Sequence, residues 1–184
     1  MHKFENWILN VIPYLEQLVI FILVSFFPSP KKLRYSLLMK LVLQKVSQAS
    51  VSVEGNVRGS ISQGYMLLLG VMQGDTEAQA EWLAEKVLKM RLFDGAEGKI
   101  NDQTVVDIAG GILVISQFTL AGSLEKGNRP AFTDAASPEE GKRLYEHFTE
   151  ELRKSGLTVE TGEFGAMMEV SLVNDGPCTI LLEH

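Results

Sequence analysis

Four consecutive residues near the middle of the chain combine two hydroxyl groups with a strand end. Ser116, Gln117, Phe118 and Thr119 directly follow the apolar run 112–115, which is typical of a buried strand. The hydroxyls of Ser116 and Thr119 are potential nucleophiles. The backbone N–H groups at such a strand end can also face a ligand. An ordinary strand end explains the same residues, and on spacing alone that interpretation has more weight.

A second unusual segment, Asn174-Asp175-Gly176-Pro177, lies near the end of the chain. It separates two stretches that both predict strands, 168–173 and 179–182. Proline cannot donate a hydrogen bond to a strand ladder, so Gly176-Pro177 predicts a sheet edge or a turn. A tight loop without any function fits this segment equally well.

Other catalytic patterns are missing from the sequence. It contains no nucleophile elbow, no phosphate-binding P-loop and no H-E-x-x-H helix. Its three histidines are scattered, and His147, the only one away from the ends, is expected on the polar surface of a helix. Cys178 is the single cysteine, and we expect an inert, buried thiol. These counts argue against a zinc site, and we expect no metal and no cofactor.

The charge and length narrow the function classes further. A net charge of -6 argues against a protein that binds nucleic acid through electrostatics alone. An enzyme that holds one end of an RNA through a few local contacts remains compatible with that charge. The 184 residues are enough to bury a hydrophobic core without disulfides.

The pattern of apolar residues predicts one α+β domain over residues 39–184. Strands are expected at 41–46, 50–53, 64–71 and 112–115, with a hairpin turn at 54–56. A capping-box pattern at 76–79 predicts a helix over about 76–91. Ser137-Pro138 predicts the start of a second helix, with Gly156 near its end.

Residues 1–38 differ from the rest of the chain and allow three interpretations. They hold an uninterrupted apolar run at 18–24, but polar residues and Pro13 interrupt the half before it. A membrane anchor is therefore an imperfect fit. A signal peptide would fit the short apolar core and Lys3, but no A-x-A-like cleavage site follows. We favour the third interpretation, in which Met39 is the true start and residues 1–38 are translated upstream sequence.

Several segments from Met39 onward resemble D-aminoacyl-tRNA deacylases in order and spacing. The most specific are Ser-Gln-Phe-Thr-Leu at 116–120, Asn-Arg-Pro-Ala-Phe-Thr at 128–133, Thr-Gly-Glu-Phe-Gly-Ala-Met-Met at 161–168 and Val-Ser-Leu-Val-Asn-Asp-Gly-Pro at 170–177. Segments 44–51 and 69–76 match as well. The resemblance implies a three-layer β/β/α domain that forms a homodimer with active sites at its interface.

The resemblance also implies an activity, namely hydrolysis of the ester between a D-amino acid, or glycine, and the terminal adenosine of tRNA. Catalysis is assigned to Ser116, Gln117, Phe118 and Thr119. Their backbone N–H groups would form an oxyanion hole, and the ribose 2′-OH of the substrate would take part. A covalent role for Thr119 is the second mechanism.

Two further sets of residues follow from the same resemblance. Gly176 and Pro177, joined by a cis bond, would reach into the partner's site and reject L-amino acids. Lys126, Arg129 and Phe132 are candidates for tRNA contact, although solvated loop charges explain the two cations nearly as well. We expect action in the cytoplasm, no DNA binding, and a membrane only if residues 1–38 are native. A binding module of the same fold that lacks turnover is the alternative function.

Overall fold

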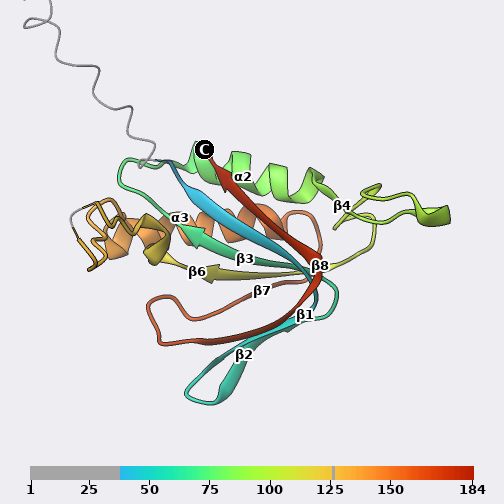
Figure 1. Cartoon of the computed structure of the whole chain (residues 1–184), viewed down its shortest axis with the longest axis horizontal. Helices are drawn as coiled ribbons and strands as arrows, with labels where there is room; N and C mark the ends of the chain where they lie inside the picture. Colours follow the sequence, from blue (N-terminus) through green and yellow to red (C-terminus); the bar gives the residue numbers. More distant parts are fainter. Residues whose placement is uncertain (1–37, 126) are drawn as a thin grey trace, which may run out of the picture. The chain divides into compact units, whose positions relative to one another are not determined.

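The computed structural model describes residues 38–125 and 127–184, which belong to one compact unit (Figure 1). The predicted extension 1–38 lies outside the described residues except for Leu38. None of the described helices is long and apolar enough to cross a membrane.

A mixed sheet forms the body of the molecule. Its strands run in the order β2-β1-β3-β6-β7, and β8 pairs with β1. The β3–β6 and β6–β7 pairs are parallel and the others are antiparallel. The strands are β1 (Lys40–Val53), β2 (Asn56–Ile61), β3 (Gly64–Gly70), β6 (Gly111–Ser116), β7 (Val159–Thr161) and β8 (Glu169–Glu183).

Two of these strands are longer than the sequence predicted. The expected strands 41–46 and 50–53 are one continuous β1, and the two expected C-terminal strands are one continuous β8. The sequence interpretation was therefore wrong in treating Gly176-Pro177 as a break between two strands, but the predicted sheet edge is confirmed. β8 pairs only with β1 in the described part of the chain. A proline is tolerated there because its missing N–H faces no second strand.

The expected hairpin between β1 and β2 is present. Val53 pairs with Asn56, and the two turn residues Glu54 and Gly55 have φ of 52° and 75°. Two consecutive positive φ values are the signature of a type I′ turn, which matches the twist of the flanking strands.

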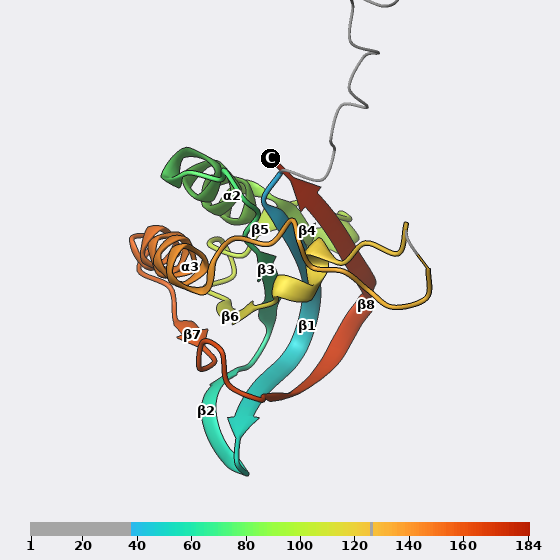
Figure 2. The same ribbon diagram turned by 90° about the vertical axis from the view of Figure 1, so that its left-hand side faces the viewer.

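Two α-helices in the described residues pack on the same side of the sheet (Figure 2). α2 (Glu77–Lys89) begins with the predicted capping box between Thr76 and Gln79. α3 (Pro138–Arg153) begins with Ser137, whose hydroxyl accepts the N–H of Glu140 at 3.3 Å. Both helix predictions are confirmed to within two residues at their termini, because the caps fix where each helix starts.

Two short strands and two 3-10 turns complete the described part of the fold. β4 (Arg91–Phe93) and β5 (Gln103–Thr104) form a separate two-stranded sheet, with the 3-10 turn η2 (Ala96–Gly98) between them. A second 3-10 turn, η3 (Phe118–Ala121), follows β6 after one residue.

The core has two parts, one on each face of the sheet. Alternate residues of β3, namely Tyr65, Leu67 and Leu69, pack in the cluster that contains both helices. Met66, between them, belongs to a second cluster with Val51 of β1 and Leu113 of β6. The second cluster also holds partly buried residues from the first half of β8. The sheet therefore curls over its own face opposite the helices.

The curl brings the two ends of the strand order close together. Arg58 of β2 forms an ion pair at 3.4 Å with Glu163, just after β7. A Cβ on Gly59 would lie 2.9 Å from the carbonyl oxygen of Thr161, so glycine permits this approach. The result is a mixed, nearly closed sheet with two helices, which confirms the predicted α+β class.

Candidate active site

The Ser-Gln-Phe-Thr segment (residues 116–119) lies where β6 leaves the core. The four residues before it, 112–115, are fully buried, and Ser116 pairs with Leu69 of β3. The N–H of Gln117 still donates to the Leu69 carbonyl at 2.7 Å. The strand then ends, because the next residues enter the 3-10 turn η3.

The start of η3 exposes backbone donors. The first N–H groups of a helical turn have no acceptor inside the turn. Leu120 N–H donates to the Gln117 carbonyl at 3.2 Å, and Gly122 N–H donates to the Thr119 carbonyl at 2.9 Å. The described residues provide no acceptor for the N–H groups of Phe118 and Thr119, and both residues are exposed. Two adjacent backbone donors are therefore left without a protein acceptor in the described part of the chain.

The side chains of the segment form few polar contacts. Gln117 Nε2 donates to Thr119 Oγ1. Among the described residues, no histidine, lysine or carboxylate contacts the Thr119 hydroxyl. Phe118 is 57% exposed, and its ring meets that of Phe132 edge to face with centroids 5.1 Å apart. The segment thus offers donors and an aromatic surface, but no base for Thr119.

A cation that the sequence analysis missed lies beside the segment. Lys40 Nζ donates to the Leu120 carbonyl at 3.3 Å and lies 3.9 Å from a carboxylate oxygen of Glu183. Lys40 starts β1, and the donor and acceptor are 80 residues apart in sequence. No local pattern signals such a contact, because it depends on how β1 pairs with β3.

A buried hydrogen bond from α3 also anchors β6. The Tyr145 hydroxyl donates to the Val114 carbonyl at 2.8 Å, two residues before the segment begins. Burial raises the pKa of Tyr145 to about 12, so this phenol remains protonated and able to donate at neutral pH. α3 therefore helps to fix the position of the strand that carries the segment.

The loop after η3 brings Phe132 back to the segment. Ser123 and Ala131 form a two-bond bridge, with N–H to O distances of 2.8 and 2.9 Å, that closes the loop. Arg129 is exposed near the tip of that loop and has no ion pair within the described residues. Lys126 lies outside the described residues. Of the two residues proposed for tRNA contact that the structure describes, Phe132 contacts the segment through the ring of Phe118.

The Gly-Pro loop (residues 174–178) forms an exposed bend in β8. Gly176 and Pro177 are exposed and joined by a cis peptide bond. Asn174 spans the bend: its Oδ1 accepts Cys178 N–H at 3.0 Å, and its Nδ2 donates to the Cys178 carbonyl at 3.3 Å. Lys45 Nζ and Asp175 form an ion pair at 3.4 Å. Cys178 is half-buried, so the prediction of a buried thiol was wrong.

The sheet register separates this loop from the Ser-Gln-Phe-Thr segment within one chain. Ser116 is level with Leu69, and Leu69 with Leu41 of β1, whereas the bend in β8 falls between Gln44 and Val46. About four residues along the strands and three strand spacings across them correspond to roughly 20 Å. In Figure 1, β6 accordingly ends at the left of the molecule and β8 bends at the right.

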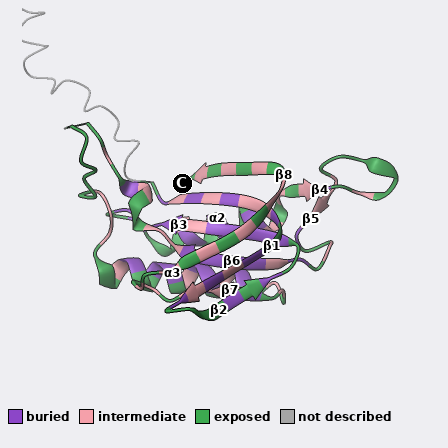
Figure 3. Ribbon diagram, turned by 60° about the horizontal axis from the view of Figure 1, so that its bottom comes forward, coloured by how far each residue is buried: buried purple, intermediate pink, exposed green. Residues whose placement is uncertain are grey.

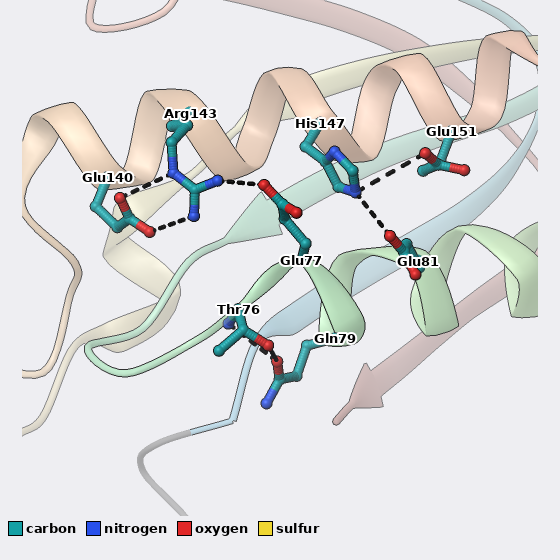
Figure 4. A network of polar contacts seen from close by, with 8 residues as sticks. All are labelled: Thr76, Glu77, Gln79, Glu81, Glu140, Arg143, His147 and Glu151. Carbon is teal, nitrogen blue, oxygen red and sulfur yellow. Dashed lines mark hydrogen bonds and ion pairs between the residues drawn. The ribbon is translucent and has the colours of Figure 1, made fainter.

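A polar network joins the two helices (Figure 4). His147 Nε2 lies 3.2 Å from Glu81 and 3.8 Å from Glu151. Glu151 also pairs with Lys154, and Arg143 pairs with Glu77 and Glu140. His147 was predicted as a solvated surface residue, but its side chain is only 25% exposed. The interpretation was wrong because α2 packs against that face of α3.

Comparisons with known proteins identify the family. Residues 42–183 match the sequence profile described as D-Tyr-tRNA(Tyr) deacylase. A D-aminoacyl-tRNA deacylase of Exiguobacterium sibiricum is 53% identical over 145 residues, which are 79% of this chain and 99% of that protein. One from Pelobacter propionicus is 54% identical over 146 residues, 79% of this chain and 100% of its own.

Two solved structures have a similar fold. A c-Myc DNA Unwinding Element Binding Protein has a TM-score of 0.74 and 40% identity, covering 79% of this chain and 98% of its own. A probable eukaryotic D-amino acid tRNA deacylase has a TM-score of 0.71 at 18% identity, which supports the fold alone. The sequence relatives and the matched profile show that this chain belongs to the D-Tyr-tRNA(Tyr) deacylase family, whose members are hydrolases.

Proposed function

We propose that this protein hydrolyses the ester of D-aminoacyl-tRNA, and of glycyl-tRNA, in the cytoplasm. Water adds across the ester bond, so that the free amino acid and the ribose hydroxyl of tRNA are released. The observation that carries the proposal is that the backbone N–H groups of two exposed residues, Phe118 and Thr119, have no acceptor within the described residues. The names of the curated relatives supply the substrate class.

The two N–H groups would stabilise the charge that develops on the carbonyl oxygen of the ester. A tetrahedral intermediate places a negative charge on that oxygen, and preorganised donors lower its energy. Each such donor contributes about 10² to 10³ in rate. The anchoring of Gln117 N–H on Leu69 keeps the start of η3 in one position, which suits donors that must be preorganised.

The general base is proposed to come from the substrate. Thr119 has no basic side chain in contact with its hydroxyl among the described residues, which disfavours a covalent route. The ribose 2′-OH lies next to the ester on the terminal adenosine and can assist the attacking water. Thr119 then serves as a positioning residue held by Gln117.

Selection of the D-enantiomer is assigned to the Gly-Pro loop of a second copy of the chain. In one protomer the loop and the Ser-Gln-Phe-Thr segment are roughly 20 Å apart, so a single chain does not bring them together. The exposed loop belongs to β8, an edge strand on which Val173 and Leu181 are exposed apolar residues. Figure 3 shows exposed and intermediate residues along β8. Unpaired edges of this kind are templates for association.

The loop would act by exclusion. A backbone segment close to the α-carbon of the substrate leaves room for hydrogen on one side only. An L side chain would collide with it, whereas a D side chain or glycine would not. Recognition through backbone predicts tolerance for the identity of the D side chain.

Contact with tRNA is proposed to be local. The net charge of -6 does not favour a broad electrostatic footprint, and the same charge argues against DNA as a partner. Arg129 and Lys126 are the proposed phosphate or ribose contacts, with Phe132 as a stacking surface for the terminal base. Because few phosphates are neutralised, binding is expected to be weak and to decrease further with added salt.

The test is a parallel incubation of the protein with D-tyrosyl-tRNA and L-tyrosyl-tRNA, in which the loss of each ester is followed. Hydrolysis of the D form with the L form intact is the expected result. Binding of D-tyrosyl-tRNA without hydrolysis, by a folded protein, would replace the enzyme with a binding module. Equal hydrolysis of both forms would refute the role of the Gly-Pro loop.

A further inference from the structure

Asp75 is a buried carboxylate that plays no part in the proposed reaction. It lies in the turn between β3 and α2 and is 6% exposed. Its Oδ2 accepts the N–H of Met72 at 2.6 Å, but its Oδ1 has no hydrogen-bond partner within the described residues. Burial raises the pKa of Asp75 to about 6. A buried acid with an unsatisfied oxygen is costly unless a cation or further donors accompany it.

A candidate partner is the backbone nitrogen of Met39, because Lys40 pairs with Gly70 at the end of β3, just before the turn that holds Asp75. Met39 is fully buried, and its N–H also acts on Asp75, where it lowers the pKa of the carboxyl. The single hydrogen of that amide is already donated to the carbonyl of His184 at 3.0 Å, and Met39 accepts the N–H of His184 at 3.1 Å. As a peptide amide, Met39 therefore cannot satisfy Asp75 Oδ1 as well.

An α-ammonium group at the same position would supply the hydrogen-bond donors that the amide lacks. It carries three hydrogens and a full positive charge, whereas an amide carries one hydrogen and no charge. One hydrogen can bond to His184 as before, and the other two are free for the Asp75 carboxylate. The charge also compensates the buried carboxylate, which no neutral donor can do.

We propose that Asp75 is the buried counter-ion of a free α-amino group on Met39, and hence that the folded protein is a chain whose first residue is Met39. Two observations support this: Asp75 Oδ1 is buried without a partner in the described residues, and the Met39 N–H, which acts on the same carboxyl, is already donated to His184. The curated relatives are consistent with it, because this chain matches them over nearly their whole length with only 79% of its own.

The first experiment identifies the start of the native protein. The gene is expressed with its own upstream region, and the purified protein is analysed by intact mass and N-terminal sequencing. We expect the sequence Met-Lys-Leu-Val with an unmodified amino group. A protein that begins at Met1, or at any other residue before Met39, overturns the proposal.

The second experiment tests the ion pair on that same purified protein. The rate of α-amine labelling is measured against pH, and its midpoint is compared with the ordinary α-amino pKa of about 7.7–8.0. Pairing with Asp75 should raise the midpoint by at least about one unit, which slows labelling at pH 7 about tenfold. A midpoint at or below the ordinary value contradicts the ion pair. This measurement needs no substituted protein.

Two substitutions assign the shift to Asp75. Asp75→Asn keeps the size of the side chain but removes its charge, so the labelling midpoint should fall by about one unit or more. Asp107→Asn is the matched control, because Asp107 also accepts a backbone N–H, from Thr104 at 2.8 Å, but is exposed and lies elsewhere. Its midpoint should match the wild type. Equal midpoints in both variants would overturn the assignment to Asp75.

Discussion

The Ser-Gln-Phe-Thr segment and the Gly-Pro loop are held in place by different means. The segment continues a fully buried strand, and hydrogen bonds to Leu69 and from Tyr145 fix the strand that carries it. The loop lies on an edge strand, and its polar ties are the Asn174–Cys178 pair of bonds and one ion pair. Backbone donors anchored by a core tolerate side-chain changes, whereas the conformation of an edge loop depends on single residues.

Removal of one backbone donor should give the largest effect. Phe118→Pro deletes an N–H at the first position of η3, where proline is best tolerated. Gln117, before it, has φ of -140° and ψ of 78°, outside the α region that a following proline disfavours. We expect kcat for D-tyrosyl-tRNA to fall about 10²- to 10³-fold. Phe118→Ala is the control, because it removes the ring but keeps the donor; equal loss in both variants would contradict the oxyanion hole.

A side chain in the loop should have the next largest effect. Gly176 has φ of +127°, and a Cβ there would lie 3.0 Å from Cys178 N. Gly176→Ala should therefore displace the loop and lower kcat/KM at least tenfold, mainly through KM. Gly156→Ala is the control, since Gly156 has φ of +79° with nothing within 4 Å. It should cost roughly 1–2 kcal/mol of stability and leave activity unchanged. Unchanged affinity for D-aminoacyl-tRNA in Gly176→Ala would refute the role of the loop.

Loss of the amide that spans the bend should have a smaller effect. Asn174→Ala removes both hydrogen bonds to Cys178. Each such bond contributes about 0.5–1.5 kcal/mol. Because the Lys45–Asp175 ion pair still ties the loop, we expect only part of the total to reach the site and activity to fall about three- to tenfold. Asn174→Asp keeps the acceptor for Cys178 N–H, so the activity of this variant should fall less. The order of kcat/KM among wild type, Asp and Ala variants checks this, and an Asp variant no better than Ala would contradict it.

The smallest effect is expected at Thr119. If Thr119 only positions the site, Thr119→Ala loses the contact from Gln117 and should retain turnover within roughly threefold. Single-turnover rates on D-tyrosyl-tRNA measure this directly. Complete loss of turnover by a folded variant would establish the covalent mechanism instead.

Local patterns predicted the helices and the buried strands of the core. The capping residues Thr76 and Ser137 fix the helix starts, and the uninterrupted apolar run 112–115 identifies the strand that leads to the segment. These features are local in sequence, so helix and strand propensity and the periodicity of apolar residues are enough to predict them. The failures were the continuous β8 and the partial burial of His147 between the two helices. Both depend on which element packs against which face.

The site was only partly predictable for the same reason. The resemblance named residues 116–119, 176 and 177, and the apolar pattern placed the first motif at a strand end. The separation of the two motifs follows from the register of β1 with β3 and β8, which no local pattern encodes. Lys40 was missed because sheet pairing alone brings it to Leu120.

The central claim is that the two motifs act in one site built from two copies of the chain. It is tested by mixing Phe118→Pro and Gly176→Ala proteins under conditions that allow subunits to exchange. Each mixed dimer would contain one site with both motifs intact, so random exchange should restore about one quarter of wild-type activity. Activity that stays at the average of the two parent variants, with exchange verified by mass, would contradict the account.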